Sequence, residues 1–339
     1  MTPAIKKATQ QKHPKIERLL NLQNIRTLSF LAAACLLLMT CIWAFTLTGK
    51  TTEPFIANVP ESVAIKRLKA MGDEGLVIQY SESNPWHGRD YPHWSIFPTI
   101  SAAKEDVDLL LIKAAPYLRK LTGNKVVNLY GTNLTNAGLK AFVGVSDIRV
   151  LSLSTSKVSD EGILALPNLQ TLKEIEFDNT QITDKALKHL AMAKDLESII
   201  AFDSKLTGLG FEAFTQHEHL DALLLSGSKI DRRGLRAISK LKTIKSLRLG
   251  RMPINDDDIS LLKELTQLES LLLQETEITD KGVEHLKDLI HLNHLWLDGT
   301  RVTDACLVHL SQMKDLRSLR YGKRQDTISL DLRKIPNND

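Results

Sequence analysis

A repeat of 24 residues restricts the fold of this chain more than any other feature of its sequence. Leucine or isoleucine opens one block after another without a slip in register, at Leu172, Leu196, Leu220, Ile244, Leu268, Leu292 and Leu316. Within each block, apolar residues occupy positions one, four and six, as in Leu268, Leu271 and Leu273. An L-x-x-L-x-L run of this kind predicts a short strand with one buried face.

The second half of each block predicts a turn and then a helix. A Thr-Asp pair, such as Thr279 and Asp280, usually stands at positions twelve and thirteen. These side chains accept hydrogen bonds from free N–H groups and suit the positive end of a helix, so we expect both to cap the helix that follows. Apolar residues at sixteen and nineteen, such as Val283 and Leu286, predict its inward face. The small residue at fifteen, here Gly282, indicates close approach of helix and strand.

One strand and one helix cannot bury both apolar faces alone, so the blocks must stack into a solenoid. The pattern L-x-x-L-x-L-x-x-T-x-I-T-D-x-G-L resembles the leucine-rich repeat family, in its strand-and-helix subclass, and is similar to repeats common in bacterial proteins. The resemblance implies an α/β fold, a leucine-rich repeat solenoid with a parallel β-sheet on its concave face and helices on its convex face. Eight full 24-residue copies occupy residues 124–315.

The N-terminal part of the chain predicts a membrane anchor. Residues 1–26 form a basic tail with six Lys or Arg and one Glu, and residues 27–48 contain no charge. At about 1.5 Å per residue, this apolar run is long enough to cross the roughly 30 Å hydrocarbon core as one transmembrane helix. Because Lys50 is the only basic residue in the fifteen that follow the run, we expect a cytoplasmic N-terminus and periplasmic or extracellular repeats. A cleaved signal peptide is the alternative.

Residues 50–123 and 316–339 flank the repeats without matching them, and open solenoid ends need such covering units. The first segment predicts an N-terminal α/β cap with a degenerate first repeat, and it resembles the cap of bacterial membrane-anchored relatives. We expect a helix in 62–71, a strand in 76–80 and a helix in 106–121, while the aromatic segment 84–94 suits either cap packing or a docking loop. The second segment predicts a C-terminal partial repeat or cap with a final edge strand.

The sequence contains no pattern typical of catalysis. No G-x-S-x-G, P-loop or Cys-His nucleophile signature is present, and the histidines lack further ligands at metal spacing. We therefore expect no enzyme activity, no metal and no small-molecule cofactor. The net charge is +4 and residues 1–26 contribute +5, so the remainder sums to −1. A nearly neutral repeat region gives no electrostatic reason to expect nucleic acid as a partner.

Function is expected on the concave face. Position five of each strand lies between two buried leucines and must point the opposite way. With position seven it predicts an apolar stripe, interrupted by one arginine and bordered by Glu176 and Arg320, that consists of Ile200, Phe202, Leu224, Arg248, Leu272 and Trp296. Lateral packing between neighbouring strands explains the stripe equally well. Since Trp and Arg are common interface anchors, the first hypothesis is a membrane-anchored module that binds a protein partner. The alternative is a structural or self-associating envelope protein.

Overall fold

The computed structural model of the chain describes residues 63–81, 92–99, 106–167, 169–311, 313–323 and 327–331. The basic tail (1–26), the apolar run (27–48) and most of the aromatic segment 84–94 lie outside these residues, so what the sequence predicts for them stays a prediction. None of the helices in the described part is both long and apolar enough to cross a bilayer.

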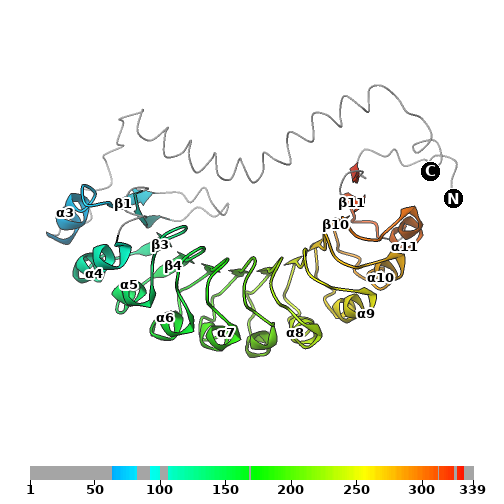
Figure 1. Cartoon of the computed structure of the whole chain (residues 1–339), viewed down its shortest axis with the longest axis horizontal. Coiled ribbons are helices and arrows are strands. Elements are labelled where there is room, and N and C mark those ends of the chain that lie inside the picture. Colours follow the sequence, from blue (N-terminus) through cyan, green and yellow to red (C-terminus); the bar gives the residue numbers. More distant parts are fainter. Residues whose placement is uncertain are drawn as a thin grey trace, which may run out of the picture. The chain divides into compact units, whose positions relative to one another are not determined.

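The described strands form one sheet in which spatial order follows chain order (Figure 1). They are β1 (Leu76–Ser81), β2 (His93–Pro98), β3 (Asn124–Asn128), β4 (Ile148–Ser152), β5 (Glu174–Glu176), β6 (Ser198–Ile200), β7 (Ala222–Leu224), β8 (Ser246–Arg248), β9 (Ser270–Leu272), β10 (His294–Asp298), β11 (Ser318–Gly322) and β12 (Ile328–Asp331). Pairing is parallel from β2 to β11 and antiparallel between β1 and β2 and between β11 and β12. Stacked units that pack chiefly against their neighbours give this order.

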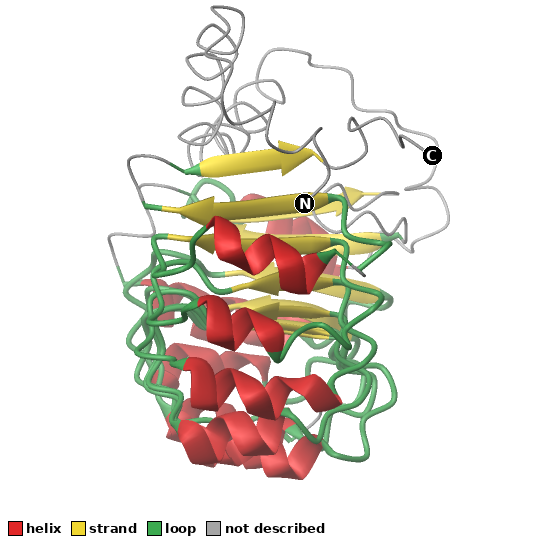
Figure 2. Cartoon of the chain, turned by 90° about the vertical axis from the view of Figure 1, so that its right-hand side faces the viewer, coloured by secondary structure: helices red, strands yellow, loops and turns green. Residues whose placement is uncertain are grey.

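Helices connect the strands and lie together on one side of the sheet (Figures 1 and 2). They are α3 (Val63–Ala70), α4 (Val107–Leu118), α5 (Asn136–Leu139), η3 (Lys140–Phe142), α6 (Asp160–Leu164), α7 (Asp184–Leu190), η4 (Leu209–Phe214), α8 (Arg232–Ile238), α9 (Asp256–Ile259), η5 (Ser260–Glu264), α10 (Asp280–Glu284), η6 (Asp304–Cys306) and α11 (Leu307–Leu310), where η denotes a 3₁₀ helix. The helices of the repeats have only one or two helical turns. The strand and the two loops of each 24-residue block take up most of its residues.

The strands pair in the register that the repeat period predicts. Leu247 pairs with Leu271, and Leu271 pairs with Leu295, each 24 residues further along the chain. All three leucines have no exposed surface, and neither have the inward helix residues Val283 and Leu286. The predicted α/β solenoid with a parallel sheet is therefore confirmed for the described residues.

The Thr-Asp pairs connect neighbouring repeats as well as capping helices. Thr279 caps its own helix, since its hydroxyl accepts a hydrogen bond from the N–H of Lys281. The carboxylate of Asp280 accepts hydrogen bonds from the N–H and the hydroxyl of Thr303, in the next repeat, at 2.9 and 2.7 Å. We call this contact the Asp-Thr link; it also joins Asp108 to Thr135, Asp160 to Thr183, Asp184 to Thr207 and Asp256 to Thr279. Threonine caps as predicted, but the aspartate acts on the next repeat.

The Asp-Thr link is replaced by other contacts where Gly208 and Arg232 stand in place of the aspartate. In the repeats that follow, position twelve is Asp231 or Asn255, and each of these side chains accepts a hydrogen bond from a backbone N–H three residues further on. Arg232 also donates from Nη1 to the carboxylate of Asp258, at 2.9 Å, which joins two repeats by an ion pair. The repeat that carries Gly208 has the 3₁₀ helix η4, which starts after this glycine in a left-handed conformation, whereas the repeat that carries Arg232 keeps the α-helix α8.

Small residues at position fifteen make room for the neighbouring helix start. A Cβ on Gly282 would collide with the carboxylate of Asp256, which accepts the hydrogen bonds of Thr279. A Cβ on Gly162 would lie 2.6 Å from the amide oxygen of Asn136. The close approach therefore occurs between successive helix starts, and not between helix and strand as we had expected from the sequence.

Position eight has a left-handed backbone in all eight repeats. The residues with positive φ there are Gly131, Thr155, Asn179, Asp203, Gly227, Arg251, Glu275 and Gly299. A side chain in this conformation costs about 1 kcal/mol or more, which glycine avoids. The lack of a side chain at Gly227 also lets Asp203 and Arg251, two repeats apart, form an ion pair at 3.1 Å across it.

The two ends of the solenoid are covered by units that differ from the repeats. At the N-terminal end, α3 and β1 lie where the sequence predicts a helix and a strand, and α3 packs against α4. Trp94 is buried there, and its Nε1 donates to the carbonyl oxygen of Thr122 at 3.1 Å, so this residue of the aromatic segment packs within the cap. At the other end, β12 is the edge strand expected after the last repeat.

Candidate binding surface

Residues at position five form a continuous row across the sheet. The strand register places Glu176, Ile200, Leu224, Arg248, Leu272, Trp296 and Arg320 side by side in this order. Their chain neighbours at positions four and six, such as Leu223 and Leu225, have no exposed surface. Because side chains alternate along a strand, the row lies on the face opposite the helices. The predicted stripe therefore exists as one connected surface.

Most side chains of the stripe are less exposed than isolated surface side chains would be. Ile200, Phe202, Leu224 and Trp296 are half-buried, and Arg248 is exposed. Leu272 is only 6% exposed, so the expectation that it is open to solvent needs correction. Its partners on the two adjacent strands, Arg248 and Trp296, have longer side chains and flank it on both sides. Leu272 therefore supports its neighbours, and part of the stripe is lateral packing.

Arg248 is the charged residue in the middle of the row. No hydrogen bond or ion pair joins its guanidinium group to any residue that the structure describes, and its neighbours across the sheet are Leu224 and Leu272. The residue is exposed on the whole, but the surrounding protein removes part of its hydration and lowers the pKa of Arg248 from its ordinary value. Arginine nevertheless stays protonated in proteins. Arg248 thus offers a positive charge with unused donors between apolar side chains.

Trp296 and Arg320 pack against each other at the C-terminal end of the row. The guanidinium group of Arg320 lies over the indole ring, 4.6 Å from its centroid. The same group contacts the carboxylate of Asp298 at 3.4 Å, and both of these side chains are largely buried. The indole N–H of Trp296 is buried and has no hydrogen-bond partner among the described residues. Arg320 is thus engaged, whereas Trp296 is held in place with one donor unused.

Acidic residues border the stripe on the N-terminal side. Glu174 and Glu176 lie on β5, and Asp178 follows them with its carboxylate accepting a hydrogen bond from the N–H of Phe202 at 2.6 Å. Burial raises the pKa of Asp178, and the hydrogen bonds from Phe202 and Ser154 partly oppose this. The row therefore changes from acidic through apolar to basic between β5 and β8.

Position three adds a column of small residues that the sequence reading missed. Ser198, Ala222, Ser246 and Ser270 lie beside one another in the strand register. They share the face of the stripe because positions three and five of a strand point the same way. The alternation used for position five would have identified them. These four side chains are half-buried.

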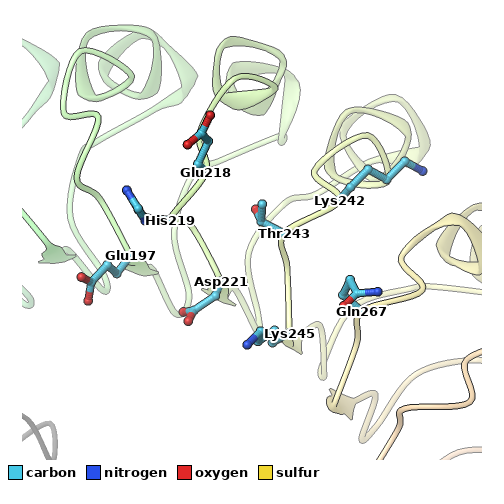
Figure 3. A pocket seen from close by; sticks show the side chains of 8 residues that line it. All are labelled: Glu197, Glu218, His219, Asp221, Lys242, Thr243, Lys245 and Gln267. Atoms are coloured by element: carbon cyan, nitrogen blue, oxygen red, sulfur yellow. The ribbon is translucent and has the colours of Figure 1, made fainter.

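Two hollows among the described residues lie along the two edges of the sheet at which the strands begin and end, and not on the row. One, of about 420 Å³, is lined by Glu197, Glu218, His219, Asp221, Lys242, Thr243, Lys245 and Gln267, which come from the loops before β6 to β9 (Figure 3). The other, of about 720 Å³, includes Arg251, Glu275, Arg301 and Lys323 at the opposite edge. Both mix acidic and basic side chains. No group of three His, Cys, Asp or Glu in the described part could hold a metal ion.

Comparisons with known proteins add structural neighbours but no relative by sequence. No protein-family model matches the chain, and neither does any curated protein. A crystal structure of an internalin from Listeria monocytogenes has a TM-score of 0.48 and 24% identity, over 58% of this chain and 53% of that one. An internalin C2 from the same organism has a TM-score of 0.47 and 17% identity, over 63% of this chain and 84% of that one. The match spans about half the length of the first structure.

Proposed function

We propose that this chain is a membrane-anchored recognition module that binds a protein partner through the face of the sheet opposite the helices. Arg248 carries the proposal, because its charge has no partner among the described residues and lies between apolar neighbours. Groups of this kind are common anchors of interfaces. Ile200, Phe202, Leu224 and Trp296 surround it in the binding surface, with Leu272 beneath. We assign the chain no catalytic step, metal, small-molecule cofactor or nucleic-acid partner.

Partner binding is tested by crosslinking the full chain in intact cells and identifying the captured protein by mass spectrometry. Arg248→Ala and Trp296→Ala should each reduce capture by about tenfold, which corresponds to about 1.4 kcal/mol. Arg236→Ala is the matched control, since Arg236 is exposed on α8 on the opposite side of the sheet. Full capture by both sheet variants and loss in the control would place the interface on the helices.

The alternative, a structural or self-associating protein, predicts a different outcome of the same experiment. A self-associating chain would recover chiefly its own copies, and its sedimentation coefficient would increase with concentration. A recognition module would recover a different protein and sediment independently of its own concentration. Sedimentation velocity of the purified full chain in detergent therefore separates the two functions.

The anchor in this proposal is the uncharged segment 27–48, with residues 1–26 in the cytoplasm and the repeats outside it. The excess of Lys and Arg before the segment supports this orientation. Alkaline phosphatase fused after Asn338 should be active, because it folds only on the far side of the membrane. An inactive phosphatase together with an active cytoplasmic reporter at the same position would reverse the orientation.

A further inference from the structure

Helix α4 presents apolar side chains to solvent on its outer face. Leu109 and Ile112 are each 49% exposed. They are three residues apart, and the exposed Pro116 follows four residues later, so the three lie on one face of the helix. The other large exposed hydrophobic residues of the described chain stand singly, such as Val308 on α11. We call Leu109, Ile112 and Pro116 the α4 stripe.

Basic residues lie on α4 and on the neighbouring helix α3. Lys113, which follows Ile112 on α4, and Lys120, two residues after the helix ends, are both exposed. Lys113 lies 3.5 Å from Glu74, but both side chains are more than half exposed, so water and salt weaken this pair. The adjacent helix α3 exposes Lys66, Arg67 and Lys69. Long basic side chains beside apolar ones are typical of surfaces that meet lipid headgroups.

Helices α8 and α10 of the repeats have no pair of exposed apolar residues like that of α4. Helix α8 exposes Arg233 and Arg236, and α10 exposes Lys281 and Glu284, so their outer faces are charged. The buried side of α4 is fully apolar as in those helices, with Leu111 and Leu118 unexposed. Its outer apolar residues are thus additional to those that hold it on the core. Leu109 and Ile112 are not required for the packing of α4 if its outer face contacts only water.

The sequence places this helix close to the proposed anchor. Residues 49–62 connect the apolar run 27–48 to α3, and a chain of this length spans at most about 50 Å. A tether of this kind keeps the cap near the bilayer surface at high local concentration, so a weak affinity for lipid is sufficient. The connection therefore favours the bilayer over a soluble partner as the occupant of the stripe.

We propose that α4 lies on the surface of an anionic bilayer, with the α4 stripe at the boundary between headgroups and acyl chains and with Lys113 and Lys120 beside lipid phosphates. This proposal rests on the membrane anchor of the proposed function. Contact at α4 fixes the N-terminal end of the solenoid on the membrane. The face that carries Arg248 lies on the other side of the sheet from the helices and stays free for a partner.

The experiment uses the full chain in vesicles of phosphatidylcholine with or without phosphatidylglycerol. Cys35, Cys41 and Cys306 are replaced by alanine, and an environment-sensitive dye is attached to Ile112→Cys or, as the control, to Val308→Cys. In anionic vesicles the dye at position 112 should shift its emission to shorter wavelength and lose intensity when doxyl-labelled lipid is included. The dye at position 308 should respond as it does in water. Replacing Lys113 and Lys120 by glutamine should reduce the ratio of bound to unbound α4, by roughly fivefold for each lysine.

Each outcome decides between the proposals. If the chain floats with the vesicles but the dye at position 112 stays as exposed as that at 308, the α4 proposal is wrong while the anchor stands. If the chain does not float at all, the anchor fails and the α4 proposal fails with it. A shift that appears in detergent and grows with protein concentration shows that a second copy covers α4, which also overturns the proposal.

Discussion

Replacing Asp184 by alanine should destabilise the solenoid more than the same change at any other aspartate of the Asp-Thr links. Asp184 accepts four hydrogen bonds from the next repeat: two from the N–H and hydroxyl of Thr207 and one each from the N–H groups of Gly208 and Gly210, all between 2.8 and 2.9 Å. Both glycines are buried. The variant therefore removes the acceptor of N–H groups that water cannot easily reach.

The magnitude follows from the number and burial of the lost contacts. A buried donor left without a partner costs about 1 to 3 kcal/mol, so the two glycine N–H groups and the bonds of Thr207 together predict a loss of about 3 to 5 kcal/mol for Asp184→Ala. Asp280 accepts two hydrogen bonds in an exposed setting where water can replace it. Asp280→Ala should therefore cost only about 1 kcal/mol. Asp304 accepts one hydrogen bond from the hydroxyl of Tyr321, so Asp304→Ala should lower the free energy of unfolding by no more than Asp280→Ala does.

Urea unfolding followed by circular dichroism measures these differences, with Lys281→Ala as the control because that side chain is exposed. Long repeat arrays can unfold in steps, so amide hydrogen exchange at Gly208 and Gly210 should be measured in addition. Faster exchange at these two amides is expected in Asp184→Ala and not in Asp280→Ala. If Asp184→Ala is as stable as Lys281→Ala, the links do not hold the repeats together and the reasoning fails.

Three further changes test other parts of the structure. Leu271→Ala should lower the free energy of unfolding by about 2 to 5 kcal/mol, since this side chain has no exposed surface; a loss below that of an exposed leucine would contradict its place in the core. Gly227→Ala should be destabilising by about 1 kcal/mol or more, because φ is +76° and the new Cβ would collide with the carboxylate of Asp203; unchanged urea midpoints would refute the collision. Burial, and to a smaller extent the charge of Lys194, lowers the pKa of His217. On acidification His217 therefore becomes protonated at a higher pH in the unfolded chain than in the folded chain. Stability should therefore decrease as pH falls below the ordinary histidine value of about 6.5, and His217→Gln should reduce this dependence on pH.

The repeat period was sufficient to predict the sheet but not the contacts between repeats. Leu271 could be placed in a strand, in register with its neighbours and facing inward, because apolar spacing reports burial directly. The role of Asp280 could not be read in the same way, since a side chain in a stacked array lies as near to the residue 23 positions ahead as to the next turn of its own helix. The left-handed position eight had a visible signal in Gly131, Gly227 and Gly299, which stand there in three of the repeats. Because Thr155, Arg251 and other residues with side chains occupy the same position in the remaining repeats, glycine does not stand out there in the sequence.

The candidate surface was predictable as a set of residues but not as a pattern of exposure. Alternation along the strands identified Arg248 and Trp296 as neighbours of Leu272 on one face. Whether Leu272 is exposed to solvent depends on the lengths and rotamers of the residues on the adjacent strands. The spacing of apolar residues in the sequence does not give this information. The same holds for Arg320, whose contact with Asp298 and the indole ring leaves Arg248 as the arginine of the row without a partner among the described residues.

The Asp-Thr links determine which repeats can be removed or duplicated without loss of fit. A regular repeat supplies the aspartate of one junction and the threonine of the preceding one. Removal of a repeat therefore preserves these contacts only when the two repeats that become neighbours carry matching groups. Excision of residues 280–303 joins Thr279 to Asp304 and leaves the contacts of both intact. Excision of residues 256–279 removes Asp258, and with it the ion pair of Arg232. The solenoid can therefore change its length by whole repeats near its C-terminal end, whereas the order of repeats around Gly208 and Arg232 is fixed.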